Sequence, residues 1–254
     1  INDLIISLIQ KFVRRLILAD PDNFEANIGR PVLYLGNHQM YVETFQFLSI
    51  VTVLSHTPTE AIAKKEHLGT WVANIFHLAE AEMPNTNPLQ MLFFDREDPS
   101  DMFRILNDFS ETLDDNPRSL LVHVDGTRAW QAGQPTLKVS SVLIDFAVNH
   151  NLPIVPLCFA GGLPLEPRKE RLEFPVDYGR QDFYVGAGIE PAELKALPYA
   201  ERAKRVLAAI NSLGPGIYDQ PIEADESFAE LLGSTSGEKS ETQQVLSSTL
   251  QMLP

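Results

Sequence analysis

Short apolar runs, each bounded by Gly, Pro or polar residues, alternate along the chain with longer segments in which apolar residues recur at helical spacing. The short runs are typical of buried strands, and the longer segments are typical of helices with one apolar face. The predicted strands are residues 31–36, 61–63, 91–94, 119–124, 153–157 and 182–186. The predicted helices are residues 41–55, 68–79, 98–113, 139–149 and 191–210. This alternation predicts an α/β fold in which helices cover a mixed, mostly parallel sheet.

The first residues form one more apolar pattern. Within residues 4–18, apolar side chains recur near helical spacing, and Lys11, Arg14 and Arg15 interrupt them. A membrane span needs roughly 18 unbroken apolar residues, so an amphipathic helix is the better interpretation. Such a helix either packs on its own domain or a preceding one, or it lies on a membrane surface.

The segments suggest three regions. Residues 1–30 are expected to form the N-terminal helix and lead-in, residues 31–221 the α/β domain, and residues 222–254 a linker-like tail rich in Ser, Thr and Glu. The chain has 254 residues and begins with Ile1 rather than Met. We therefore expect a domain cut from a longer protein, with neighbouring domains as partners.

Composition and charge narrow the function. The 34 acidic residues outnumber the 20 Lys and Arg residues and give a formal charge of −14, which argues against nucleic-acid binding. Cys158 is the only cysteine, so no internal disulfide and no Cys-rich metal site can form. This fits a cytoplasmic protein, with peripheral membrane contact as the remaining possibility through the N-terminal helix.

Four strand ends carry polar residues that need an explanation, and the first contains His38 and Glu43. If His38 lies ahead of the next helix and Glu43 reaches back from its first turn, the carboxylate fixes the imidazole tautomer. The other ring nitrogen is then free to act as a base, as in a Ser-His-Asp site. A capping or packing histidine is the alternative.

The other three strand ends are less distinctive. Arg96 follows residues 93–95 and either clamps a phosphate or pairs with a nearby acid. Residues 125–128 contain Gly126, which permits a tight turn, and Arg128; backbone N–H groups there either hold an anion or simply form the turn. Residues 154–157 include Pro156 and say little alone.

Metal ligation is a poor explanation of the remaining polar residues. The acidic cluster at residues 95–101 is explained by helix capping, with Asp98 as cap and Pro99 at the first helical position. The histidines other than His38 lack metal-ligand spacing and are interpreted as surface or satisfied buried residues: His56, His67, His77, His123 and His150.

Taken in order, the four segments resemble the motif blocks of the PlsC-type glycerolphospholipid acyltransferases, the lysophosphatidic acid acyltransferase superfamily. The family's first block is Asn-His, four residues and Asp; here Asn37 and His38 are followed by Glu43. The second block ends in Asp-Arg, as in residues 93–96. The third is Pro-Glu-Gly-Thr-Arg-Ser, here residues 124–129, and the fourth is Ile-Val-Pro-Val, here residues 154–157.

The resemblance implies a glycerol-3-phosphate acyltransferase-like fold and a role for each matched residue. His38 would deprotonate the acceptor hydroxyl, which attacks an acyl thioester without a covalent acyl-enzyme, and Glu43 would orient the imidazole. No metal or other cofactor is implied; acyl-CoA or acyl carrier protein is the donor substrate, and a lysophospholipid or glycerol phosphate is the acceptor. The residues implied to line the acceptor and phosphate pocket are Asn37, Lys64, Lys65, Arg96, Asp125, Gly126, Thr127, Arg128, Lys138 and Pro156.

Departures from the family motifs leave the acceptor open. Glu43 replaces Asp, Asp125 replaces Glu, and the Pro before the latter is missing. A His-x4-Glu motif is similar to the acyltransferase part of phytyl-ester and wax-ester synthase-like proteins, so a long-chain alcohol is the alternative acceptor. The chain is also similar to acyltransferase domains within multidomain polyunsaturated fatty acid or polyketide synthases. An acidic carrier protein would then dock on Lys11, Arg14 and Arg15.

Two rivals from other classes remain. A catalytically weak, acyltransferase-like module would bind lipid or hold neighbouring domains together, and the two changed acidic residues are its support. A hydrolase with Cys158 as nucleophile is disfavoured, because this cysteine lies in an apolar strand run with no histidine nearby in sequence.

Overall fold

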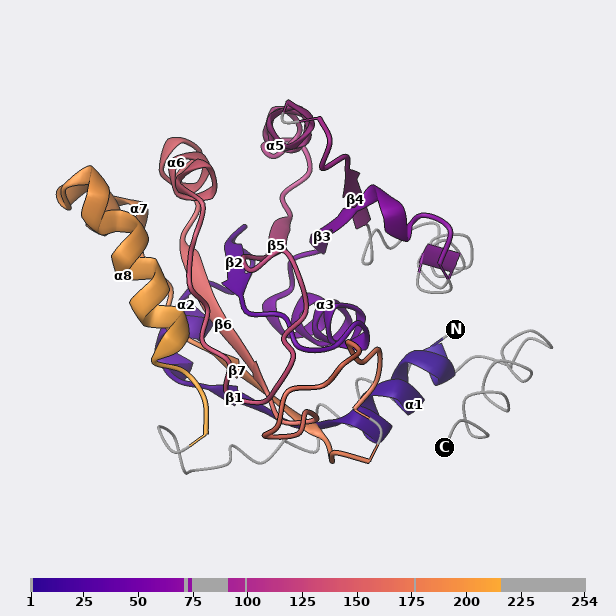
Figure 1. Cartoon of the computed structure of the whole chain (residues 1–254). Helices are drawn as coiled ribbons and strands as arrows, with labels where there is room; N and C mark the ends of the chain where they lie inside the picture. The colour runs from indigo at the N-terminus through magenta and orange to yellow at the C-terminus, as the bar shows by residue number, and fades with distance from the viewer. Residues whose placement is uncertain (1, 71–72, 75–90, 99, 176, 216–254) are drawn as a thin grey trace.

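A seven-stranded sheet runs through the centre of the molecule (Figure 1). In this computed structural model, the residues described are 2–70, 73–74, 91–98, 100–175 and 177–215. The strand order is β1-β7-β6-β2-β5-β3-β4. The five strands from β6 to β4 are parallel, β7 is antiparallel to β6, and β1 is parallel to β7. The strands are β1 (Val13–Leu18), β2 (Leu33–Gly36), β3 (Thr59–Lys64), β4 (Met91–Phe94), β5 (Ser119–His123), β6 (Ile154–Ala160) and β7 (Gln181–Val185).

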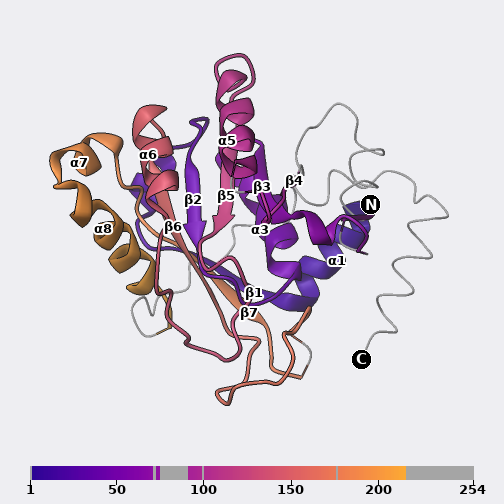
Figure 2. The same cartoon turned by 45° about the horizontal axis from the view of Figure 1, so that its top comes forward.

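Helices cover both faces of the sheet, which confirms the predicted α/β class. Helices α1 and α3 lie on one face, while α5, α6 and the α7–α8 pair lie on the other. Figure 2 shows β2 beside β5 with α5 and α6 nearby. The helices are α1 (Asn2–Phe12), α2 (Pro21–Ala26), α3 (Val42–Ser55), the 3₁₀ turn η1 (Lys65–His67), α5 (Asp101–Glu111), α6 (Ser141–Asn149), α7 (Pro191–Ala196) and α8 (Tyr199–Asn211).

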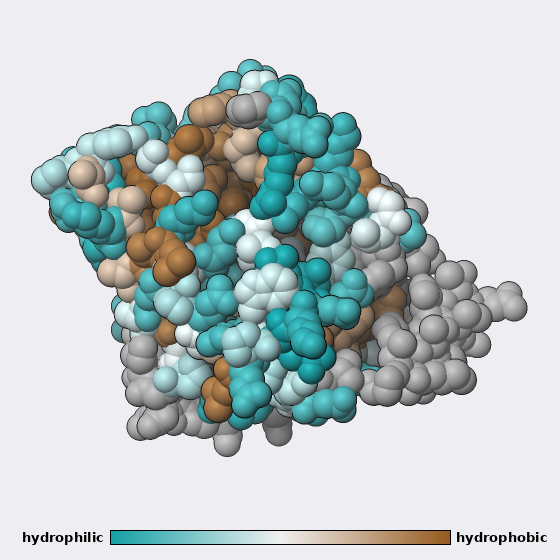
Figure 3. Space-filling model, in the orientation of Figure 1, coloured by the Kyte–Doolittle hydropathy of each residue, from teal (hydrophilic) through white to brown (hydrophobic). Residues whose placement is uncertain are grey.

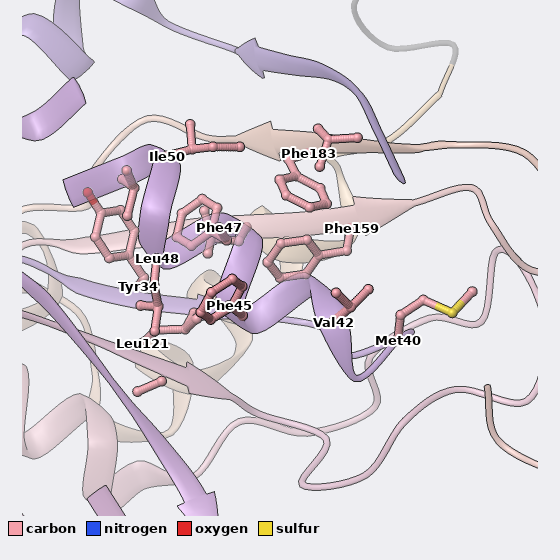
Figure 4. Packing of buried hydrophobic residues seen from close by; sticks show 14 of the residues in the cluster. Tyr34, Met40, Val42, Phe45, Phe47, Leu48, Ile50, Leu121, Phe159 and Phe183 are labelled. Carbon is pink, nitrogen blue, oxygen red and sulfur yellow. The ribbon is translucent and has the colours of Figure 1, made fainter. Parts of the chain in front are cut away.

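Alternation of side chains along the strands divides the core into two layers. In β2, Tyr34 faces the α3 layer, and its neighbours Leu33 and Leu35 face the layer of α5 and α6. The α3 layer is built on aromatic rings (Figure 4). Phe47 packs edge-to-face against Tyr34, with centroids 5.4 Å apart, and against Phe159, with centroids 5.6 Å apart. These contacts fix α3 on the sheet and therefore fix the loop that precedes it.

The prediction of one helix over residues 4–18 is wrong. Helix α1 ends at Phe12, and β1 begins at Val13. The physical reason lies in a distant strand: Asp182 of β7 is fully buried and binds the guanidinium groups of both Arg14 and Arg15. An ion pair formed only in the tertiary structure cannot be read from local periodicity.

The apolar stripe of α1 packs on its own domain. Leu4, Leu8 and Phe12 are buried in the same layer as α3. The packing interpretation is therefore confirmed, and this stripe is not available to a membrane surface. Within the described residues, no helix is both long enough and apolar enough to span a bilayer.

Two further helix predictions differ from the structure, and three elements, β1, α2 and η1, were not predicted at all. The helix over residues 191–210 is two helices, because Pro198 has no backbone N–H to continue the first. Helix α5 begins at Asp101 rather than at Asp98, whose carboxylate instead accepts from Ser100. Most of the helix predicted over residues 68–79, and the whole tail from residue 222, lie outside the described residues.

The parallel strands bring the predicted chemistry to one edge of the sheet. Gly36 at the end of β2 is in register with His123 at the end of β5, and β3 ends beside them at Lys64. The carboxyl ends of neighbouring parallel strands are where α/β proteins place their ligand sites.

Candidate active site

The loop that carries His38 is held on both sides. Gly36 ends β2 against β6 so closely that a Cβ there would meet the Leu157 Cβ at 2.8 Å. The Asn37 side chain then binds the backbone of Phe159 twice, donating to its carbonyl at 2.9 Å and accepting from its N–H at 2.7 Å. The Ala129 N–H donates to the His38 carbonyl at 2.7 Å. His38 therefore projects from a fixed loop.

His38 and Glu43 are in contact, as predicted. His38 Nδ1 lies 2.8 Å from Glu43 Oε1, and the Glu43 side chain is fully buried in the first turn of α3. The same carboxylate accepts the backbone N–H of Gln39 at 2.7 Å and of Met40 at 3.0 Å, and the Gln181 side chain donates to it at 2.8 Å. Glu43 thus caps the free N–H groups ahead of α3 while it orients the imidazole.

Burial determines the protonation of the pair. It lowers the pKa of His38 well below the ordinary value, and the positive charges of Arg128 and Lys64 lower it further, so the imidazole is neutral near pH 7. Burial raises the pKa of Glu43 to about 7, an effect opposed by nearby His123 and by the hydrogen bond from Gln181. With Glu43 ionised, Nδ1 carries the proton of the neutral ring, and Nε2 keeps its lone pair.

A cavity of about 210 Å³ opens beside this pair. Its polar end is formed by His38, Tyr41, Thr44, Lys64, His67 and His123. Its remaining wall is mainly apolar and comes from the strand ends and from α5 and α6: Ile62, Ala63, Met91, Phe94, Met102, Val122, Val124, Val142 and Leu143. In Figure 3 a hydrophobic hollow is visible between the regions of α5 and α6 on an otherwise mostly hydrophilic face.

The mouth of the cavity is electropositive although the chain as a whole is acidic. The charges of Arg128, Lys64, His67 and Arg171 all act on His38. Burial and nearby Arg96 lower the pKa of Lys64. The cations Lys64, Arg128 and Arg171 come from β3 and two loops, and an anionic group bound near them would reduce their mutual repulsion.

Two predicted arginines are held near the site by backbone oxygens. Arg128 donates to the Leu172 carbonyl at 2.7 Å and lies over the Tyr41 ring, 5.1 Å from its centroid. Arg96 donates to the Gly126 carbonyl. Gly126 has φ +62° and lines the cavity, but its N–H donates to the His123 carbonyl at 3.1 Å. That N–H is therefore engaged in the turn rather than offered to an oxyanion.

Other predicted pocket residues lie away from this cavity. Lys65 points to a separate hollow and pairs with Asp95 at 3.4 Å. Pro156 is buried within β6 against Gly186, and Asn37 holds the β6 backbone. Thr136 donates to the Asp125 carboxylate at 3.2 Å; Thr127 is half-buried and Lys138 is exposed. Among the predicted binding residues, Lys64 and Gly126 line this cavity, whereas Lys65, Pro156 and Asn37 do not; the roles implied for them in binding stay predictions.

Sequence reasoning missed three residues at the site. His123 stacks on His38 with ring centroids 3.9 Å apart and planes 20° from parallel. Its signal was its place at a strand end, next to residues 124–129. His67 lies in η1, where the short 3₁₀ turn left no periodic signal. Arg171 lies in a long irregular loop, and its guanidinium carbon is 3.9 Å from the centroid of the Trp130 ring. Such a loop has no sequence pattern that would have pointed to Arg171.

The ligand atoms of His38, Glu43 and His123 lie within 4.8 Å of one another, close enough for a metal site. Each of them already has a hydrogen-bond partner, however. Glu43 accepts the donors described above, and His123 lies 2.6 Å from the Asn37 carbonyl and 2.8 Å from Thr44 Oγ1. The arrangement is that of a hydrogen-bonded base, with both Glu43 oxygens occupied by N–H donors.

Cys158 does not share the cavity with His38. It lies on the opposite side of the His38 loop, in another hollow, and burial raises the pKa of its thiol to about 12. A thiolate is therefore strongly disfavoured, which counts against the hydrolase interpretation.

A sequence model of the acyltransferase family matches residues 15–160, more than half of the chain. The matched region contains β2 through β6 and every strand end that forms the cavity. The chain belongs to the acyltransferase family, of the PlsC type that the motif blocks indicated. No curated protein matches it.

Proposed function

We propose that the protein transfers a fatty acyl group from an acyl thioester, carried by CoA or by acyl carrier protein, to a hydroxyl of a lysophospholipid or glycerol phosphate. The observation that supports this most strongly is the 2.8 Å contact between His38 and the buried Glu43 at a cavity. Membership of the acyltransferase family supports acyl transfer as the reaction class. The donor, acceptor and residue roles are the proposal.

In the proposed mechanism His38 acts as general base. Its Nε2 removes the proton of the acceptor hydroxyl as that oxygen attacks the thioester carbonyl carbon. The imidazolium formed is stabilised by the Glu43 carboxylate through Nδ1. When the tetrahedral intermediate collapses, the C–S bond breaks and His38 returns the proton to the thiolate. No acyl-enzyme forms, and base catalysis of this kind contributes about 10²–10⁴ in rate.

Charge supports a phosphate-bearing acceptor. Lys64 lines the cavity, and the positive charges of Arg128 and Arg171 also act on His38. Arginine and lysine are the usual partners of phosphate oxygens. A cavity of about 210 Å³ is smaller than the roughly 300–1,000 Å³ of sites that enclose a drug-sized ligand, so it would take the reacting end and part of one chain.

The surface proposed for docking of the acyl donor differs from the one expected from the sequence. Arg14 and Arg15 both bind Asp182, which neutralises part of their charge. They are therefore poorer sites for an acidic carrier than the sequence suggested. The group of Lys64, Arg128 and Arg171, whose charges act on His38, is the better candidate for the phosphate of a CoA or carrier thioester.

A long-chain alcohol is the second candidate acceptor, and the apolar wall of the cavity favours it. Valine, leucine and methionine side chains there would accommodate an alkyl chain without demanding a phosphate. Neutralising Lys64 separates the two acceptors: the Lys64→Met variant should raise KM for lysophosphatidic acid and leave KM for an alcohol unchanged.

The decisive experiment measures acyl transfer from acyl-CoA and from acyl carrier protein to lysophosphatidic acid, glycerol phosphate, other lysophospholipids and a long-chain alcohol. His38→Ala should lose at least about 10²-fold in kcat with the fold intact. His150→Ala is the matched control, because this exposed histidine follows α6, tilted against the Phe146 ring and outside the cavity, and its loss should leave activity unchanged. A parent protein that binds lipid yet transfers no acyl group to any acceptor would favour the non-catalytic module.

A further inference from the structure

His123 makes three contacts with the segment that carries the catalytic pair: it stacks on His38 and is hydrogen-bonded to Asn37 and to Thr44. Its ring covers one face of His38 at 3.9 Å, nearly parallel to it, and both rings line the same cavity. Neither motif matching nor the proposed mechanism assigns His123 a role. Its place at the end of β5, in register with Gly36 of β2, brings it to the His38 loop.

Two hydrogen bonds fix the orientation and tautomer of His123. Nδ1 lies 2.6 Å from the Asn37 carbonyl, which can only accept, so Nδ1 carries a proton. Nε2 lies 2.8 Å from the Thr44 hydroxyl, which donates to it when the ring is neutral. Asn37 is the residue before His38, and Thr44 is the residue after Glu43. One ring therefore ties together the two ends of the segment that carries the pair.

The charge of His123 matters because His38 becomes positive during the reaction. The titratable groups facing His123 are His38 and Glu43, and burial lowers the pKa of His123 to about 3. A neutral ring presents an electron-rich face to the imidazolium that forms next to it, whereas a protonated ring would repel it. Stacking also prevents His38 from turning its Nε2 edge away from the cavity.

We propose, on the basis of the proposed acyl transfer, that His123 is a positioning residue that locks the orientation of the His38 ring and supports its positive charge in the transition state. The chemistry is unchanged: His38 moves the proton, and His123 stays neutral and hydrogen-bonded throughout. Loss of the stacked ring should then slow the chemical step while leaving substrate binding nearly as it was.

The test compares His123→Ala with His123→Phe, which keeps a flat ring against His38 but loses both hydrogen bonds. His123→Ala should lower kcat about 10–100-fold with KM changed less than about twofold, and His123→Phe should recover most of that loss. His150→Ala, which removes a histidine in tilted contact with another aromatic ring, should behave as the parent. Thermal unfolding of every variant separates loss of fold from loss of catalysis.

A second readout follows the His38 ring itself. In ¹⁵N-histidine NMR spectra, with His38 assigned by its loss in His38→Ala, the parent should show a single Nδ1–H tautomer. His123→Ala should show a mixture, and His123→Phe should show the parent tautomer. If His123→Ala is too unstable to measure, His123→Leu takes its place, because it also removes the flat ring that covers His38 while leaving a smaller void, and it should give the same change.

Unchanged kcat and an unchanged His38 tautomer in His123→Ala would overturn the proposal. So would equal losses in the Ala and Phe variants that follow their folded fractions while the tautomer stays the same. A parent without acyl transfer would contradict the proposed function instead, and the tautomer measurement would still report on the positioning role alone.

Discussion

One methylene separates Glu43 from the aspartate that the family motif carries at this position. The longer side chain reaches His38 Nδ1, two backbone N–H groups and Gln181 at once. Both carboxylate oxygens therefore have N–H partners, and the glutamate is fitted to the geometry of its own loop. The residue type at this motif position differs from that of the family, while its contact with the histidine is the one that the motif implies.

We expect Glu43→Asp to be damaging even though it restores the family residue. The shorter carboxylate cannot keep His38 and Gln181 together, so kcat should fall by about 10²-fold, as for other misplacements near 1 Å. Glu43→Gln should be worse, because its NH₂ group would face an N–H donor. Steady-state kinetics of both variants test this; an aspartate variant as active as the parent would show that the extra reach is not used.

Activity should depend on the charge of the same carboxylate. Because burial raises the pKa of Glu43 to about 7, the ionised form that stabilises the His38 imidazolium is lost as pH falls through that value. We expect kcat/KM to rise with pH up to about 7 and then level off. A pH–rate profile of the parent checks this, and a profile that stays flat from pH 5 to 9 would contradict it.

At the scale of elements, the joint between β1 and β7 depends on one buried acid. Burial alone would raise the pKa of Asp182, but the hydrogen bonds from Arg14 and Arg15 outweigh it, and the pKa lies below the ordinary value. A carboxyl with a lowered folded-state pKa stabilises the fold above its unfolded pKa and loses that effect as pH falls through the folded one.

Asp182→Asn should therefore destabilise the protein by about 2 kcal/mol at pH 7, less than for a fully buried pair because Arg14 and Arg15 are partly exposed. The difference between variant and parent should shrink once the pH falls below about 4. Urea unfolding at several pH values measures it. Glu190→Gln, which removes the exposed partner of Arg30, is the matched control and should cost little.

Elements with their own local pattern were predictable, and elements that depend on distant partners were not. The strands at residues 31–36, 91–94 and 119–124 and helix α3 follow from apolar periodicity, and their order brings the His38 loop to the sheet edge. Strand β1 was missed because Asp182 stabilises it from a distance of 168 residues along the chain. The contact within the pair and the positions of Lys64 and Gly126 at the cavity were predictable from the sequence. His67 was missed because only tertiary packing brings it to the cavity, and Arg171 was missed because only tertiary packing brings its charge near His38.

At the scale of the whole molecule, the first thirty residues belong to the core of the fold. Leu4, Leu8 and Phe12 are buried with α3, and β1 continues the sheet beyond β7. The family match also begins before residue 30, at residue 15. A boundary at residue 31 thus cuts through packed and hydrogen-bonded structure.

A fragment of residues 31–215 should fail to fold cooperatively, whereas a fragment of residues 1–215 should unfold in a single transition. The shorter fragment exposes the apolar surface that α1 covers and leaves Asp182 buried without its two arginines. Circular dichroism during heating compares the two. A sharp transition in the shorter fragment would show that α1 and β1 are accessory.

Two consecutive residues of β7 hold different parts of the structure in place. Gln181 donates to the Glu43 carboxylate, and Asp182, one peptide bond later, is anchored by the arginines of β1. Consecutive residues of β7 thus contact both the edge strand β1 and the carboxylate that orients His38. Separation of β1 from β7 would therefore begin one peptide bond away from the amide that holds the Glu43 carboxylate.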